Sequence, residues 1–263
     1  MGRISRLLRE LPQLPLVLPP VIALFAVGGF TVVAIPLNPQ VTADLSQGAS
    51  FRFKIGLDLP EFTFKVIPEV RDPVGGNPQS IVRDIEVYRG DSKQPSQHLT
   101  GCNWTDMEPP PRGSDWLRTE DVNFDGYNDV WLMAWWGATG NEGGCIWLYN
   151  PATGRFDYSK EFSGLDSHGL DPATKTILTY SNGGMLGLVF NASKYKVENN
   201  KPMLLMHEIQ DWSVEKKQFH CVIEEPQGTA MVVTREEWSR PGNDWTKLVA
   251  PCDPGKLFEG FRH

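Results

Sequence analysis

The stretch Asp121-Val122-Asn123-Phe124-Asp125-Gly126-Tyr127-Asn128-Asp129 largely decides the fold and the site that we predict for this chain. Oxygen-bearing side chains stand at positions 1, 3, 5 and 9 of this stretch, and a glycine stands at position 6. Alternate residues of a tight loop turn their oxygens inward, and glycine permits the sharp reversal, so the spacing suits a hard divalent cation. We therefore predict a Ca²⁺ site whose ligands are Asp121, Asn123, Asp125, Tyr127 (through its carbonyl) and Asp129.

The residues after this loop predict a strand rather than the second helix of an EF-hand. An EF-hand loop carries a bidentate Glu at position 12, where this chain has Leu132. The run from Val130 to Trp136 is apolar and aromatic, which favours a β-strand. We expect a calcium loop that opens into a strand. The alternative is a hairpin turn without metal, because Asp, Asn and Gly are also the common turn residues.

Alternation of polar and apolar residues recurs along the chain after residue 50, as in half-buried strands. It is clear in Ser50–Ile55, Phe62–Val66 and Ile81–Tyr88. Two runs are almost wholly apolar, which is typical of central strands covered on both faces: Val130–Trp136 and Ile146–Tyr149. Further predicted strands are Arg155–Tyr158, Thr176–Tyr180, Met185–Phe190, Met203–Asp211, Gln218–Glu224 and Ala230–Glu237. With turn clusters such as Ser181–Gly184 between them, these strands predict an antiparallel, all-β domain.

The N-terminal segment has the pattern of an export signal. Three arginines within the first nine residues precede an apolar run, residues 16–37, that is long enough to span a bilayer. Small residues at Val41 and Ala43 permit cleavage before Asp44. We predict a cleaved signal peptide at residues 1–43, with an uncleaved inner-membrane anchor at residues 16–37 as the alternative. Either way, residues 44–263 form one domain in the periplasm or elsewhere outside the cytoplasm, and only the N-terminal segment contacts membrane.

Charge and cysteine content agree with this assignment. The chain has 25 basic and 32 acidic residues, a net charge of −7, which disfavours binding to nucleic acid and suits calcium or a basic partner protein. Its four cysteines have no zinc-like spacing, so in an exported chain they predict two disulfides. Three pairings are possible. The shorter loops favour Cys102 with Cys145 and Cys221 with Cys252.

Signatures of catalysis are missing from the sequence. The five histidines show no metalloprotease spacing, and there is no nucleophile elbow or phosphate-binding loop. Asp166-Ser167-His168 contains the residue types of a triad, but adjacent residues cannot adopt triad geometry. Nine tryptophans are present, and Trp135 and Trp136 point to opposite faces of a strand, so at most one of them can share the core face. We predict a protein that is not an enzyme.

Two longer segments resemble a known family. They are Glu120–Leu132 and, further along the chain, Trp147-Leu148-Tyr149-Asn150-Pro151-Ala152-Thr153-Gly154-Arg155-Phe156. Together with Ile85–Val87, Asp171–Ile177 and Ser181–Gly184, they resemble bacterial periplasmic proteins with a β-propeller-like fold and an EF-like calcium loop. The resemblance covers roughly residues 80 to 237, and the order of the motifs carries it rather than any one of them.

The resemblance implies both a fold and a partner. Some members of that family are immunity proteins that inhibit lysozyme-like effectors of type IV secretion by inserting a loop into the catalytic cleft. The best candidate for that loop here is Gly137–Gly144, between two apolar strands, in which Thr139, Asn141 and Glu142 are the candidate contact residues. In this interpretation Glu142 engages the cleft and Asn141 mimics the hydrogen bonds of a sugar. The alternative is a plain glycine-rich connection between two strands.

Two functions follow as hypotheses. The first is a calcium-stabilised inhibitor, or immunity protein, that binds a lysozyme-like peptidoglycan hydrolase. The second is a calcium-dependent surface or carbohydrate-binding module without inhibitory activity, in which an exposed tryptophan stacks on sugar rings. In both, the calcium is structural, because a loop with four side-chain ligands leaves little room for substrate.

Overall fold

The structure is a computed structural model that describes residues 48–71, 79–102, 116–239 and 251–252. The chain divides into two units, Met1–Pro39 and Gln40–His263, and every described residue belongs to the second. The predicted signal or anchor, residues 1–43, lies outside the described residues. Within the described ranges, no helix has the length and apolar character needed to cross a membrane.

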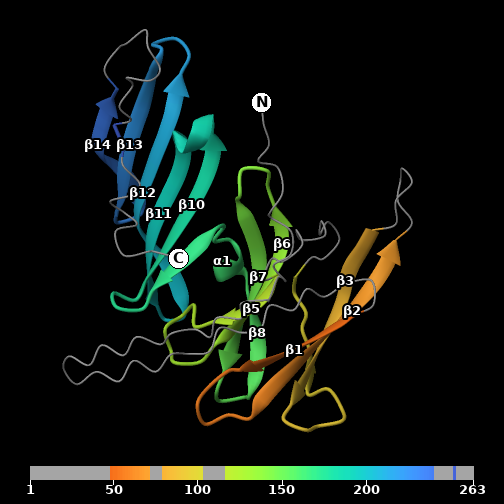
Figure 1. The fold of residues 1–263 in the computed structure, drawn as a ribbon. Helices are drawn as coiled ribbons and strands as arrows, with labels where there is room; N and C mark the ends of the chain where they lie inside the picture. The colour runs from red at the N-terminus through yellow and green to blue at the C-terminus, as the bar shows by residue number, and fades with distance from the viewer. Residues whose placement is uncertain (1–47, 72–78, 103–115, 240–250, 253–263) are drawn as a thin grey trace, which may run out of the picture. The chain divides into compact units, whose positions relative to one another are not determined.

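Three antiparallel sheets make up nearly all of the regular structure (Figure 1). The first sheet contains β1 (Ala49–Lys54), β2 (Glu61–Arg71), β3 (Gln79–Arg89) and β4 (Gln97–His98). The second contains β5 (Leu117–Glu120), β6 (Asp129–Trp136), β7 (Glu142–Asn150) and β8 (Arg155–Ser159). The third contains β9 (His168–Asp171), β10 (Thr176–Gly184), β11 (Val189–Glu198), β12 (Lys201–Ser213), β13 (Gln218–Gln227) and β14 (Ala230–Trp238). The described helices are α1 (Lys160–Ser163) and the 3₁₀ turn η2 (Met185–Gly187).

Within each sheet the strands lie in chain order, so each sheet is a meander of strands that follow one another in sequence. The prediction of an antiparallel, all-β fold is therefore confirmed. The β-propeller-like arrangement of the sheets stays a prediction.

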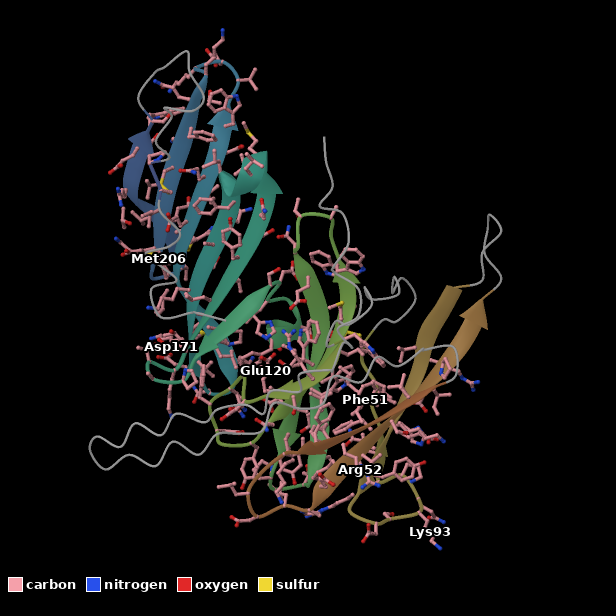
Figure 2. The ribbon with its side chains drawn as sticks, viewed as in Figure 1. Phe51, Arg52, Lys93, Glu120, Asp171 and Met206 are labelled. Atoms are coloured by element: carbon pink, nitrogen blue, oxygen red, sulfur yellow. A yellow bond between two sulfur atoms is a disulfide. The ribbon has the colours of Figure 1, made fainter. Side chains whose placement is uncertain are left out.

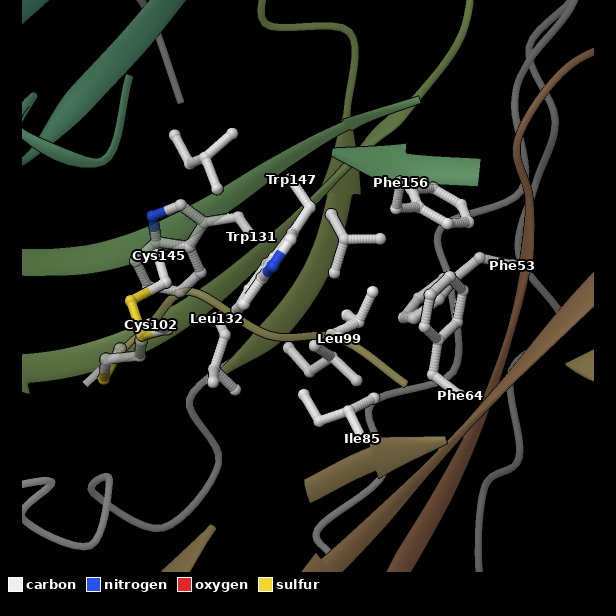
Figure 3. Close-up of a cluster of buried hydrophobic side chains, with 14 of the residues drawn as sticks. Phe53, Phe64, Ile85, Leu99, Cys102, Trp131, Leu132, Cys145, Trp147 and Phe156 are labelled. Carbon is white, nitrogen blue, oxygen red and sulfur yellow. A yellow bond between two sulfur atoms is a disulfide. The ribbon is translucent and has the colours of Figure 1, made fainter. Parts of the chain in front are cut away.

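Aromatic residues join the first two sheets in one core (Figure 3). Phe62 and Phe64 are two positions apart on β2, so both side chains point to the same face. Both rings pack edge-on against Phe156 of β8, with centroids 5.6 and 5.4 Å away. Behind them, Trp131 of β6 and Trp147 of β7 are almost completely buried. Burial of every residue from Asp129 to Met133 confirms that β6 is covered on both faces.

Both disulfides have the predicted pairing. Cys102, after β4, is bonded to Cys145 of β7, and Cys221 of β13 is bonded to Cys252. The Cα atoms are 5.9 and 5.5 Å apart, and no described cysteine is free. The first bridge ties the first sheet to the second beside Trp131 and Trp147 (Figure 3). Two disulfides indicate an oxidising, extracytoplasmic environment.

The structure corrects several predicted elements. Met185–Phe190 was predicted as one strand, but Met185–Gly187 form the turn η2 and β11 begins at Val189. Ser181–Gly184, predicted as a turn, are the last residues of β10. No strand runs through Met185 and Leu186 because both adopt left-handed backbone angles that a strand does not allow. Ser181–Gly184 are strand because they pair with β11. The short elements β4, β5, β9 and α1 were not predicted, because none is longer than four residues and so none shows a clear periodic pattern.

Candidate metal loop and the neighbouring hairpin

The predicted calcium loop connects β5 to β6, and its first carboxylate binds the loop's own backbone. Asp121 Oδ1 accepts a hydrogen bond from the Asp125 amide at 3.0 Å, and its Oδ2 accepts one from Gly126 at 2.9 Å. The reversal occurs at Gly126, whose φ is +93°. A side chain there would meet no atom within 4 Å, so backbone conformation alone favours glycine. The first carboxylate of the loop therefore turns back onto the loop's own backbone.

Asn123 and Asp125 continue this pattern in the middle of the loop. Asn123 is 6% exposed, and its Nδ2 donates to Asp125 Oδ2 at 2.9 Å. Asp125 Oδ1 in turn accepts a hydrogen bond from the Tyr127 amide at 2.9 Å. The Tyr127 ring packs on Tyr149 with centroids 5.3 Å apart, which anchors position 7 of the loop to the second sheet. Three of the predicted ligands therefore fold over one short segment of backbone.

Asp129 is the first residue of β6 and is completely buried. Its Oδ2 accepts a hydrogen bond from the Val122 amide at 3.0 Å, and its Oδ1 accepts one from the Tyr149 amide at 2.8 Å. The carboxylate therefore joins the start of the loop to β7. Burial raises the pKa of Asp129 to about 8. The hydrogen bonds from the two amides act in the opposite direction and lower the pKa, whereas repulsion from Asp125 and Asp121 raises it further.

The loop carries three acidic residues that have no basic partner among the described residues. The ion pairs of the described chain do not include Asp121, Asp125 or Asp129. Partial burial raises the pKa of Asp121 above its ordinary value, and the charge of Asp125 contributes to the rise. Three carboxylates that repel one another favour a cation between them.

The oxygen donors of the loop are of the kind that Ca²⁺ prefers, but its carboxylates do not converge on one point in this structure. In the described part of the chain, the groups of three acidic, histidine or cysteine side chains close enough to share an ion lie elsewhere. Every carboxylate oxygen has a second lone pair, so an oxygen that binds an amide can also coordinate an ion. Asp121, Asn123, Asp125 and the Tyr127 carbonyl are the residues that would hold it, with Asp129 behind them. A bound Ca²⁺ would offset most of the repulsion between these acidic residues and fix the conformation of the loop.

Asn200, which is far from the loop in sequence and was not predicted to contact it, also reaches the loop. Asn200 lies in the tight turn between β11 and β12, where Asn199 and Asn200 both have positive φ. Its Oδ1 accepts a hydrogen bond from Asn123 Nδ2 at 3.4 Å. The signal available in the sequence was the Asn-Asn pair, which is typical of such a turn but does not say what the turn contacts.

The predicted partner segment Gly137–Gly144 is partly turn and partly strand. Residues 137–141 form the turn, in which Gly137 accepts and donates hydrogen bonds with Gly140 and Asn141, while Glu142 begins β7. Gly143 and Gly144 are buried. A Cβ on Gly144 would lie 2.5 Å from the Leu132 carbonyl and 2.6 Å from the Trp131 ring. These glycines therefore serve close packing rather than flexibility.

Partners within the chain hold two of the three candidate contact residues. Asn141 Nδ2 donates to the Asn182 carbonyl at 3.0 Å, and its Oδ1 accepts from the Asn182 amide at 2.7 Å. Glu142 accepts a hydrogen bond from Arg118 Nη1 at 3.1 Å. Thr139 is exposed at the tip, where its carbonyl accepts a hydrogen bond from the Asn182 side chain at 3.4 Å. The turn is thus fixed to β10, with Thr139 among its exposed residues.

A polar cluster that was not predicted lies beneath this hairpin. Glu120, at the end of β5 (Figure 2), is 2.6 Å from the buried His168 Nε2 and 3.6 Å from Arg118 Nε. The Arg118 guanidinium also lies 3.8 Å from the centre of the Trp131 ring. Burial would raise the pKa of Glu120, but His168 and Arg118 together hold it below its ordinary value. This cluster ties the hairpin to β5 and β9, and we assign it no catalytic role.

The two tryptophans at the end of β6 agree with the prediction that at most one of them shares the core face. Trp135 is 39% exposed and Trp136 is 37% exposed, so neither shares the buried core. A β-bulge between Met133 and Trp135 changes the register of β6 against β7 at this point. A bulge breaks the strict alternation of faces, so both rings can be partly exposed.

Known proteins that resemble this chain are few and distant. The sequence matches no protein-family model and no curated protein. Its fold is similar to one solved structure, described as the structure of a Xanthomonas type IV secretion system related protein. That match has 15% sequence identity and a TM-score of 0.47, and it covers 74% of this chain and 98% of the other. Likeness at this level carries no conclusion about function.

Proposed function

We propose that this chain is an exported, calcium-stabilised β protein that inhibits a lysozyme-like peptidoglycan hydrolase as an immunity protein, without enzymatic activity of its own. One observation supports the calcium site above all. Asp121, Asp125 and Asp129 occupy a single short loop and have no basic partner among the described residues. The role of the ion is structural, since the loop joins β5, β6 and β7. In this proposal the four-stranded meanders correspond to propeller blades.

The hairpin tip supports the inhibitory part of the proposal. An inhibitor that enters a catalytic cleft benefits from a projecting turn that is rigid before binding, because ordering it on binding would cost affinity. Hydrogen bonds from Asn141 and Asn182 hold the turn, and Thr139 stands at its exposed end. The acidic charge of the chain suits a basic hydrolase. The partner is reached in the periplasm, with residues 1–43 as a cleaved signal or residues 16–37 as an inner-membrane anchor.

Calcium binding is tested by thermal unfolding of the purified chain with Ca²⁺ and with chelator. A ligand present at 100 times its dissociation constant stabilises a fold by about 2.7 kcal/mol, so chelation is expected to lower the melting temperature by several degrees. Asp125→Ala is expected to reproduce that loss, whereas Asp91→Ala, in an exposed turn elsewhere, is not. An unchanged melt in chelator would count against a bound metal.

Inhibition is tested by turbidity assays of cell-wall lysis with a panel of lysozyme-like hydrolases. We expect the wild-type chain to inhibit a member of the panel, and Thr139→Arg to weaken that inhibition at least tenfold, about 1.4 kcal/mol, without changing the melting temperature. Ala152→Arg, in the exposed turn between β7 and β8, is the matched control. Equal inhibition by Thr139→Arg and Ala152→Arg would remove the hairpin from the interface.

A second candidate function rests on the exposed tryptophans. Trp135 and Trp136 together offer aromatic surface next to the hairpin, and aromatic rings stack on the apolar faces of sugars. Titration with soluble peptidoglycan fragments, followed by tryptophan fluorescence, distinguishes the two functions. Saturable binding that Trp135→Ala abolishes, without inhibition of any hydrolase, would favour a calcium-dependent carbohydrate-binding module.

A further inference from the structure

Three metal-ligating side chains meet on one face of the first sheet, at the pair β3 and β4. Asp84 and Glu86 stand two positions apart on β3, so their side chains point to the same face. His98 of β4 lies directly opposite Glu86 in the antiparallel register. One ligand atom from each of the three residues lies within 4.8 Å of the other two. Two ligands on one strand and a third across the ladder form a tripod.

The tripod is already partly assembled. His98 Nδ1 is 2.6 Å from Asp84 Oδ2, which is closer than two ligands of one zinc ion need to be, since zinc bonds of about 2.0 Å hold tetrahedral ligands about 3.3 Å apart. Tyr88, next on the same face of β3, donates a hydrogen bond to Glu86 Oε2 at 2.7 Å. Outer partners of this kind orient a ligating carboxylate.

We propose that Asp84, Glu86 and His98 bind a divalent transition-metal ion, for which Zn²⁺ is the probe. One imidazole nitrogen and two carboxylate oxygens form a borderline donor set that zinc accepts, whereas calcium prefers oxygen ligands alone. The side chains of His98, Asp84 and Glu86 are 51%, 28% and 21% exposed, so an ion has access from solvent. Three protein ligands leave a fourth position for water.

Lys65 competes with a metal for this site. It lies directly opposite Glu86 on β2, and its Nζ is 3.4 Å from Glu86 Oε2. The Lys65 side chain is 51% exposed, so it can turn into solvent when an ion binds. The ammonium therefore weakens the site without blocking it, and removal of Lys65 should tighten metal binding.

The test is a calorimetric titration of Zn²⁺ into the purified, chelator-treated chain. We expect His98→Ala to lose one equivalent of bound zinc or to weaken that site at least tenfold. We expect Lys65→Met to tighten the same site. His207→Ala is the matched control, because His207 lies opposite Glu224 in the same cross-strand arrangement but belongs to no such group of three among the described residues.

The variants lie on partly exposed strand positions, and far-UV circular dichroism checks that each remains folded. Excess Ca²⁺ should leave zinc binding unchanged, which separates this site from the loop Asp121–Asp129. Cobalt in place of zinc gives an absorption spectrum that reports coordination directly. The proposal is overturned if zinc does not bind at micromolar concentration, or if wild type, His98→Ala and His207→Ala bind it equally.

Discussion

The loop Asp121–Asp129 and the hairpin segment Gly137–Gly144 are both short, polar and glycine-containing. They differ in how far away along the chain their hydrogen-bond partners lie. Asp121 binds amides four and five residues ahead. Asn141 binds Asn182, 41 residues away, and Glu142 binds Arg118, 24 residues away. The turn of the loop at Gly126 is held by partners within the loop itself, with distant contacts only at Asn123 and Asp129, whereas the hairpin side chains depend on strands that the segment itself does not specify.

Breaking the loop at its buried end is expected to have the largest effect. Asp129→Ala removes the acceptor of the Val122 and Tyr149 amides inside the protein. A buried unsatisfied amide costs about 1–3 kcal/mol, so we expect a loss of about 3 kcal/mol in the free energy of unfolding, measured with urea. Asp129→Asn keeps one acceptor oxygen and should lose less. Equal losses for the two variants would show that the amides do not depend on this side chain.

Two glycines of the hairpin are required for different reasons, Gly144 for close packing and Gly140 for its positive φ, and alanine substitutions distinguish the two. Gly144→Ala places a methyl group against the Leu132 carbonyl and the buried Trp131 ring, and such overpacking costs about 1–3 kcal/mol. Gly140→Ala meets no atom within 4 Å but must adopt a φ of +85°, which costs about 1 kcal/mol. We expect chemical denaturation to show the larger loss for Gly144→Ala. The reverse order would mean that the hairpin relaxes around the added methyl.

Loss of the contact between the hairpin and β10 should destabilise the fold less than the two changes above. Its main effect should be on binding of the hydrolase. Asn141→Ala removes two hydrogen bonds to the Asn182 backbone, a change of about 1–2 kcal/mol, whereas Thr139→Ala should leave the melting temperature unchanged. In the inhibition assay both variants are expected to be weaker than wild type, Asn141→Ala because its turn is less ordered. If Asn141→Ala inhibits fully, the turn need not be rigid.

Features that depend on residues close together in the sequence were predicted correctly, whereas most contacts between distant residues were not. Alternation along Phe62–Val66 and the turn at Gly126 are local, and both were predicted. The disulfide pairing was predicted because loop closure depends only on separation along the chain. The contact of Asn200 with Asn123 and the cluster around His168 were missed, because the order of strands within a sheet and the packing between sheets bring these residues together. The bulge before Trp135 was missed because no residue type specifies one.

The smallest expected effect on stability is that of Asp166, whose carboxylate lies close to Gly143 of the hairpin segment. A Cβ on Gly143 would collide with both Trp135 Nε1 and Asp166 Oδ1, so this glycine leaves room for them to approach. Partial burial raises the pKa of Asp166 above 3.8, with His168 opposing the rise. A carboxyl whose pKa is raised by folding stabilises the fold below its unfolded pKa and loses that contribution as pH rises through the folded pKa. Asp166→Asn cannot ionise, so its melting temperature should exceed that of wild type at pH 7 by more than at pH 3. A difference that is the same at both pH values would show that Asp166 ionises without cost, and the hairpin would then be supported by packing and hydrogen bonds alone.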